Sequence, residues 1–208
     1  MRYLITVSLL NSWLYALNAY EGYEDAAYED FLRSLRRERS APNAAMQTGI
    51  DFESDVEVAA MEPIIKERLD DPVYKVAAMV KGGVTQAALH VTREIDGIEF
   101  LLYGRLDWLR AGVISDIKRV NTSGKSPYQV GKYVSNIQHP FYFVICPGAS
   151  RFDYLIFDGK EVFVETYTRT TLLQPAEDWV DTTIKEFMAF LKERGLLELY
   201  FEKWEARN

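Results

Sequence analysis

The chain has 208 residues, of which 48% are hydrophobic and 13% aromatic, so it can bury a substantial core and is not intrinsically disordered. Its formal net charge of −7 by itself disfavours a nucleic-acid partner, because phosphate binding is dominated by electrostatics. The single cysteine is typical of a reducing cytoplasm, so we expect a cytoplasmic protein.

The first part of the chain predicts two helices and a loop. The apolar run that starts at Tyr3 is too short and too polar to span a membrane, and no clear small-residue cleavage site follows it. A helix over 3–19 that packs on the core is therefore the favoured interpretation. A second helix is expected over 24–39, before a loop rich in Ser, Pro, Asn and Ala.

Hydrophobic periodicity and turn signals predict the remaining elements. A helix starts near Ile50, and Pro63 ends or kinks it. Asp-Gly pairs mark two hairpin turns, and a later helical segment is interrupted by Pro140, which leaves its start open. A closing helix begins at Pro175, with Gly195 as a candidate break. In chain order, we expect strands at 85–93, 98–109 and 113–120, a loop at 121–127, a helical segment at 130–145, strands at 152–157 and 161–167, and the closing helix.

These elements predict an α/β (α+β) fold with a central mixed β-sheet flanked by helices. We expect one domain over residues 1–208. It divides into N-terminal helices (1–47), a core that carries the motifs described below (48–170) and a C-terminal helix (175–206).

Two carboxylates and one amine meet in a predicted hairpin. A two-residue turn at Ala111 and Gly112 sets Asp107 directly opposite Asp116, and Lys118 shares their face by the strand period of two. Ala111 is not favoured in turns that need a positive φ, so a one-residue slip that moves Asp107 to the other face stays open. An Asp-x-Lys triplet is more often a solvated charge pair than a catalytic site. Here it lies among apolar residues that favour burial, and buried charges require a partner or a metal.

Three further features accompany the hairpin. Glu53 lies in the first turn of a helical pattern, four residues after Gly49, and from there a carboxylate can reach a metal on the hairpin. Gly104 precedes the first hairpin carboxylate by three residues, where a small residue lets the strand approach another element. Gln138 and Tyr142 are four residues apart and therefore project from one face of a helix.

The ordered set resembles the PD-(D/E)xK nuclease superfamily, in particular its RecB-like branch, which includes bacteriophage recombination exonucleases and the Cas4 proteins. The resemblance spans about residues 48–142 and rests on Gly49-x-x-x-Glu53, Gly104-x-x-Asp107, Asp116-x-Lys118 and Gln138-x-x-x-Tyr142. It implies a restriction-endonuclease-like core. The opening run from Ile5 to Tyr15 is also similar to the first helix of that branch. Gln129 and Tyr133 match the last motif as well, but Gly131 between them disfavours a helix there.

The resemblance implies a deoxyribonuclease that depends on Mg²⁺ or Mn²⁺, more plausibly an exonuclease than an endonuclease, and that leaves 5′-phosphate and 3′-hydroxyl ends. Asp107, Asp116 and the backbone carbonyl of Ile117 would hold one ion, since hard divalent cations take oxygen ligands. Glu53 would complete the set or bridge to a second ion. Lys118 would orient or deprotonate the attacking water.

The last motif and the cysteine complete the expectations from the resemblance. Gln138 and Tyr142 would position the site and contact the DNA backbone, although Tyr142 is equally suited to be a core aromatic. Cas4 relatives carry four cysteines for an iron–sulfur cluster, which needs four thiolates. This chain has only Cys146, so it would be a version without the cluster, and Cys146 is expected to be a buried packing residue.

The expected partner is DNA, in recombination or repair in a bacterial cell, with a phage origin suggested by the resemblance. A single-strand annealing protein and a homo-oligomer follow from the same analogy. Two basic clusters flank the proposed site, and each fits either a DNA-facing surface or a solvated face. The clusters are Arg33, Arg36, Arg37 and Arg39, and Lys118, Arg119, Lys125 and Lys132.

Two other functions stay open. One is a nuclease fold that has lost catalysis and serves as a DNA-binding or assembly subunit, which the intact Asp, Asp and Lys disfavour. The other is an unrelated interaction protein whose motifs coincide by chance. His90 is expected to be a packing or surface residue, whereas His139, beside Gln138, could touch a phosphate.

Overall fold

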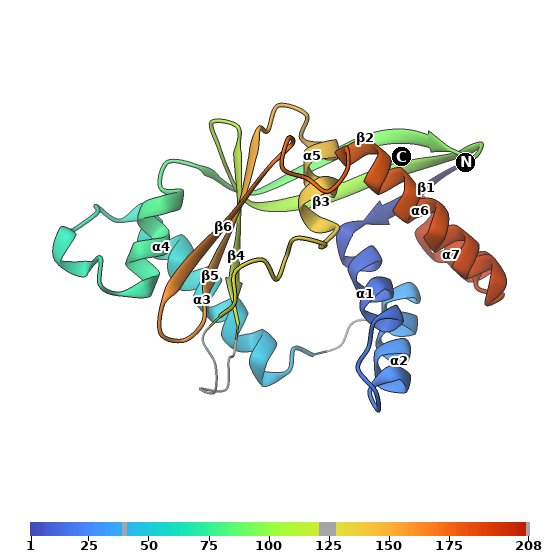
Figure 1. Ribbon diagram of the computed structural model, residues 1–208, viewed down its shortest axis with the longest axis horizontal. Coiled ribbons are helices and arrows are strands. Elements are labelled where there is room, and N and C mark those ends of the chain that lie inside the picture. Colours follow the sequence, from blue (N-terminus) through green and yellow to red (C-terminus); the bar gives the residue numbers. More distant parts are fainter. Residues whose placement is uncertain (39–40, 121–127, 207–208) are drawn as a thin grey trace.

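The computed structural model describes residues 1–38, 41–120 and 128–206 (Figure 1). They form a mixed six-stranded sheet flanked by helices, which confirms the predicted α/β class. The strands are β1 (Arg2–Thr6), β2 (Val84–Ile95), β3 (Ile98–Arg110), β4 (Val113–Arg119), β5 (Arg151–Phe157) and β6 (Val162–Thr168). The helices are α1 (Val7–Leu17), α2 (Glu24–Leu35), α3 (Ala44–Met61), α4 (Pro72–Val80), α5 (Gln138–Ile145), α6 (Ala176–Glu193) and α7 (Leu197–Trp204), with a 3₁₀ turn at Lys66–Arg68.

The long strand β3 organises the sheet. On one edge it pairs with β2 in antiparallel fashion along nearly its whole length. The other edge has two partners placed end to end: β1 runs parallel to residues 99–103, and β4 runs antiparallel to residues 108–110. Residues 104–107 of β3 pair with neither β1 nor β4. This break in the sheet positions the candidate site, because it leaves one edge of β3 open to side chains from other elements.

The β3–β4 hairpin has the expected register. Ala111 and Gly112 form the turn with φ values of +46° and +79°, and Arg110 pairs with Val113. The pairing ends at Trp108 with Ser115. One further step along both strands places Asp107 opposite Asp116, so the one-residue slip does not occur even though Ala111 must adopt a left-handed backbone.

Two hydrophobic cores lie on either side of this region. The larger packs α1, α2, α5, α6 and α7 against the sheet. The smaller packs α3 and α4 against the hairpin end of the sheet, through Trp108, Ile117 and Leu155. Figure 1 shows α3 and α4 at one end of the molecule and α1, α2, α6 and α7 at the other. In the β3 sequence, Asp107 lies between Leu106 of the larger core and Trp108 of the smaller one.

The N-terminal segment differs from the expectation. Residues 3–6 belong to β1 and not to a helix, and the helix starts only at Val7. Thr6 ends the strand and caps the helix, since its side chain accepts the Leu9 N–H at 3.2 Å. The strand forms because it finds a parallel partner in β3 about a hundred residues later, and local periodicity cannot reveal such a partner.

Other boundaries also differ. The helix α3 starts at Ala44, before Ile50, because the Asn43 side chain accepts the Met46 N–H at 2.9 Å. The helix α4, capped by Asp71, was not expected. The helical segment over 130–145 is reduced to α5, in which Pro140 lies in the first turn, where its missing N–H costs nothing.

The structure confirms one further boundary, and another expected element falls outside the described residues. The break at Gly195 between α6 and α7 is confirmed, with φ at +68°. The expected loop at 121–127 lies outside the described residues. None of the described helices combines the length and the apolar character that crossing a membrane requires.

Candidate active site

Asp116 is the most deeply buried of the predicted site residues. Only 2% of it is exposed, and both of its oxygens meet polar groups. The Lys118 Nζ lies 2.7 Å from Oδ2, and the Gln138 amide donates to Oδ1 at 2.5 Å. Strand β4 and the start of α5 therefore converge on one carboxylate.

Lys118 is held as an ammonium. Burial by itself lowers the pKa of its amine, but the charge of Asp116 and the contact with it outweigh burial, so that the pKa is raised above its ordinary value. Asp107 adds to this rise in pKa. At neutral pH the amine therefore donates and cannot abstract a proton in this arrangement.

Asp107 occupies the point where β3 and β4 separate. Its Oδ2 accepts the Ile117 N–H at 3.1 Å, a contact that takes the place of a ladder hydrogen bond between the strands. Burial raises the pKa of Asp107 well above its ordinary value, and the charges of Asp116 and Glu53 raise it further. Such mutual repulsion among buried carboxylates is relieved when a cation binds between them.

The helix α3 supplies Glu53. Its neighbour Phe52 and Val56, one turn later, pack in the smaller core, which fixes the face that Glu53 presents to the sheet. Burial raises the pKa of Glu53, and the charge of Asp116 is the next cause. The Gln86 Nε2 donates to Glu53 Oε1 at 3.0 Å and opposes this rise in pKa.

Gly104 lets α5 approach the break in the sheet. A Cβ at this position would lie 2.6 Å from Ile145 Cδ1 and 2.7 Å from Tyr142 Cε1, so only glycine fits without movement. The Tyr142 hydroxyl donates to the Arg105 carbonyl at 3.1 Å and so satisfies an acceptor in the segment that β1 and β4 leave unpaired. Tyr142 is 5% exposed, so it packs in the core while it lines the site.

A cavity of about 440 Å³ lies beside these residues. It joins Glu53, Asp107 and Tyr142 to the N-terminal end of α1, where Thr6, Val7 and Ser8 form part of the wall. The remaining lining residues are Gln86, Tyr103, Gly104 and Arg105. The cavity thus collects two of the three predicted carboxylates at a surface that a substrate can reach.

The donor chemistry fits a hard divalent cation. Carboxylate oxygens are the ligands that Mg²⁺ and Mn²⁺ prefer, and Asp116 Oδ2 is buried with no hydrogen bond, only the ion pair with Lys118. In the described part of the chain, however, no three His, Cys, Asp or Glu side chains already stand close enough to enclose one ion. The carboxylates are electrostatic neighbours, and ion binding requires that their side chains draw together.

Sequence reasoning missed an aromatic cluster behind the site. Tyr154 pairs with Asp116 across β4 and β5, and Tyr133 stacks on Tyr154 with ring centroids 4.3 Å apart. Glu165 secures the segment that carries Tyr133, because it accepts hydrogen bonds from the Tyr128 hydroxyl at 2.5 Å and the Gly131 N–H at 2.7 Å. The alternating pattern of β6 could have indicated a buried Glu165, but its partners come from a loop.

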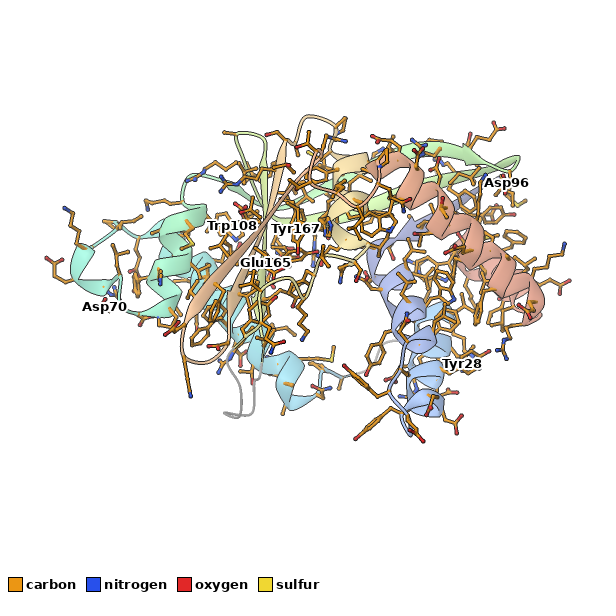
Figure 2. All side chains as sticks on the ribbon, in the orientation of Figure 1. Tyr28, Asp70, Asp96, Trp108, Glu165 and Tyr167 are labelled. Carbon is orange, nitrogen blue, oxygen red and sulfur yellow. The ribbon has the colours of Figure 1, made fainter. Side chains whose placement is uncertain are left out.

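Glu165 and Tyr167 lie together in the middle of the molecule (Figure 2), and the Tyr167 hydroxyl donates to Glu165 at 2.7 Å. His139 stacks on Tyr167 with centroids 4.2 Å apart and is completely buried. A contact between His139 and a phosphate is therefore not available in this structure. His90 is exposed on β2, as expected.

The remaining sequence candidates lie outside the site. Gln129, the alternative partner of Tyr133, is exposed and precedes α5. Arg33 and Arg36 pair with Glu29 on α2, which is typical of a solvated helix face, while Arg39 and Lys125 lie outside the described residues. Cys146 is only partly buried and packs against the larger core.

The comparisons with known proteins support the fold alone. No profile of a known protein family and no curated protein matches the sequence. Among solved structures, the chain is similar to SSO0001, with a TM-score of 0.53 and 13% identity over 90% of this chain and 76% of that one. It is also similar to the exonuclease LHK-Exo, solved in complex with dAMP, with a TM-score of 0.50 and 18% identity over 96% of this chain and 92% of the other. The chain therefore shares its overall fold with these two structures.

Proposed function

We propose that the protein is a metal-dependent DNA nuclease, an exonuclease of the bacteriophage type that acts in recombination or repair. One observation carries the proposal: Asp107, Asp116 and Lys118 meet at the break in the sheet, with Gln138 bound to Asp116. Glu53 lies within electrostatic reach of both aspartates. Chance motifs have no reason to converge in this way from four separate elements.

Each residue of the site has a separate role in this proposal. Asp107, Asp116, Glu53 and the Ile117 carbonyl would hold Mg²⁺ or Mn²⁺, which when bound makes a water more acidic and polarises the scissile phosphate. Gln138 keeps the Asp116 carboxylate in one orientation through its amide. Tyr142 fixes α5 against β3, and thereby the place of Gln138.

Lys118 would orient the attacking water and stabilise the charge that develops on the phosphate. A divalent cation held by Asp116 would compete with Lys118 for that carboxylate. Together, Lys118 and the ion would offset the negative net charge of the chain locally.

The exonuclease assignment and the partners rest on the likeness to LHK-Exo and on the motif resemblance. A single-strand annealing protein and a homo-oligomer belong to the same proposal, as does a cytoplasmic location in a bacterial or phage-infected cell.

The test is cleavage of end-labelled linear DNA and of closed circular DNA, each with and without Mg²⁺. We expect Mg²⁺-dependent loss of the linear DNA only, and no loss with Asp116→Asn. Asp153→Asn is the matched control, because Asp153 is an equally buried acid on the neighbouring strand that pairs with Arg151 and Thr166, away from the cavity. An Asp116→Asn protein that cuts as fast as the parent contradicts the proposal.

A second candidate is a nuclease-fold subunit that binds DNA without cutting it. The observation in its favour is that the described carboxylates do not already form a closed ligand set. DNA binding by the parent without cleavage at any Mg²⁺ or Mn²⁺ concentration would support it.

A further inference from the structure

The backbone of Gln86 is unusual for its place in the fold. Among the described residues, four non-glycine residues have a positive φ: Arg37, Gln86, Asp96 and Ala111. Asp96 and Ala111 are in hairpin turns, which need this conformation, and Arg37 follows the end of α2. Gln86 alone of these four lies inside a strand, with φ at +53°. A left-handed conformation of a non-glycine residue within a strand persists only when its surroundings enforce it.

The position of Gln86 in the sheet shows how its unusual backbone directs its side chain. Thr85 pairs with Trp108 and Ala87 pairs with Leu106, so Gln86 lies opposite Asp107, and that pair is left out of the ladder. The rotated backbone directs the side chain to α3, where Nε2 donates to Glu53 Oε1 at 3.0 Å. Gln86, Glu53 and Asp107 line the same cavity.

The bond is not required simply to hold α3 against β2. The adjacent Thr85 hydroxyl already links the same two elements, because it donates to Glu57 Oε1 at 3.0 Å. Glu57 is one turn further along α3 and does not line the cavity. The two neighbouring hydrogen bonds thus offer an internal comparison: one reaches a predicted metal ligand and the other does not.

We propose that Gln86 is a positioning residue, which holds the Glu53 carboxylate at the Asp107 end of the hairpin so that three carboxylates can bind one divalent cation. This inference rests on the proposed function. Residues that orient metal ligands through hydrogen bonds typically contribute about 10- to 100-fold to metal affinity. The residue belongs to none of the four sequence motifs.

The experiment compares Gln86→Asn, Gln86→Gly and Thr85→Val with the parent. Asparagine and glycine both accept a positive φ, but asparagine is one methylene too short to keep the bond to Glu53 and glycine has no side chain. Mn²⁺ binding is measured by titration calorimetry on the DNA-free protein, and folding is measured by thermal unfolding in EDTA.

We expect both Gln86 variants to bind Mn²⁺ about 10- to 100-fold more weakly than the parent. Their unfolding midpoints should equal or exceed that of the parent, because the strained backbone is relieved. Thr85→Val should bind Mn²⁺ like the parent. Parental Mn²⁺ affinity in Gln86→Asn and Gln86→Gly overturns the inference, and so does an equal loss in Thr85→Val or a lowered midpoint in both Gln86 variants. A parent that binds no Mn²⁺ removes the proposed function itself, which is a different outcome from the failure of Gln86 alone.

Discussion

Gly104→Ala tests how closely α5 approaches the break in the sheet. The new methyl group would lie 2.6 Å from Ile145 Cδ1 and 2.7 Å from Tyr142 Cε1, both well inside van der Waals contact. Overpacking of this kind costs about 1–3 kcal/mol, and the reduced entropy of the unfolded chain returns about 0.4–1 kcal/mol. We therefore expect a net loss of about 1–2 kcal/mol in the free energy of unfolding.

Urea unfolding of four proteins measures this effect: the parent, Gly104→Ala, Ile145→Val and the double variant. Ile145→Val removes the Cδ1 atom that the new methyl group would meet. The double variant should therefore lose at least about 0.5 kcal/mol less free energy of unfolding than the two single variants lose together. DNA cleavage should also fall in Gly104→Ala, because Tyr142 and Gln138 are on the displaced helix. A Gly104→Ala protein as stable as the parent, with no coupling to Ile145, refutes the reasoning.

Three further predictions concern buried polar groups. Burial lowers the pKa of His139 to about 4, so the unfolded chain takes up this proton first and the folded state loses stability as the pH falls from about 6.5 toward 4. In the parent this lowers the free energy of unfolding by about 3 kcal/mol at pH 4, and His139→Phe should abolish that decrease. Urea unfolding of both proteins at pH 7 and pH 4 measures the difference. Burial raises the pKa of Asp107, so its ionisation destabilises the metal-free fold as the pH rises. Asp107→Asn should therefore raise the thermal unfolding midpoint in EDTA more at pH 8 than at pH 4. An equal increase at both pH values would contradict this explanation. Glu165→Ala leaves the donors of Tyr128, Gly131 and Tyr167 without their acceptor, so the free energy of unfolding should fall by at least about 2 kcal/mol. Glu165→Gln should lower it less. A Glu165→Ala variant as stable as the parent in urea unfolding would show that these contacts are not stabilising.

The hairpin shows what a sequence can specify. The turn length at Ala111 and Gly112 fixes the register, and the register alone places Asp107 opposite Asp116 and Lys118 beside it. Gly104 could also be interpreted from the sequence, because a glycine in a strand indicates a close approach. These features depend on local chemistry, which short patterns express directly.

The rest depended on partners distant in the sequence. Residues 3–6 form a strand only because β3 offers an edge to them, and the same apolar run is compatible with a helix. Gln86 carries no motif, and its role follows from a backbone angle and from a hydrogen bond to a helix more than thirty positions earlier in the sequence. Glu165 likewise becomes informative only when the loop that holds Tyr128 is seen against β6.

The sequence named three carboxylates for the proposed metal site, but the structure does not arrange them as a closed set of ligands. The pattern named Glu53, Asp107 and Asp116, and the structure brings them within electrostatic reach of one another.

The most direct measurement is anomalous diffraction from crystals soaked in Mn²⁺. The account predicts an ion between the carboxylates of Asp107 and Asp116, with Glu53 drawn toward it and the Lys118 ammonium moved away from its 2.7 Å contact with Asp116. Crystals at millimolar Mn²⁺ with no anomalous peak between these two aspartates, and with Lys118 still paired to Asp116, would contradict it.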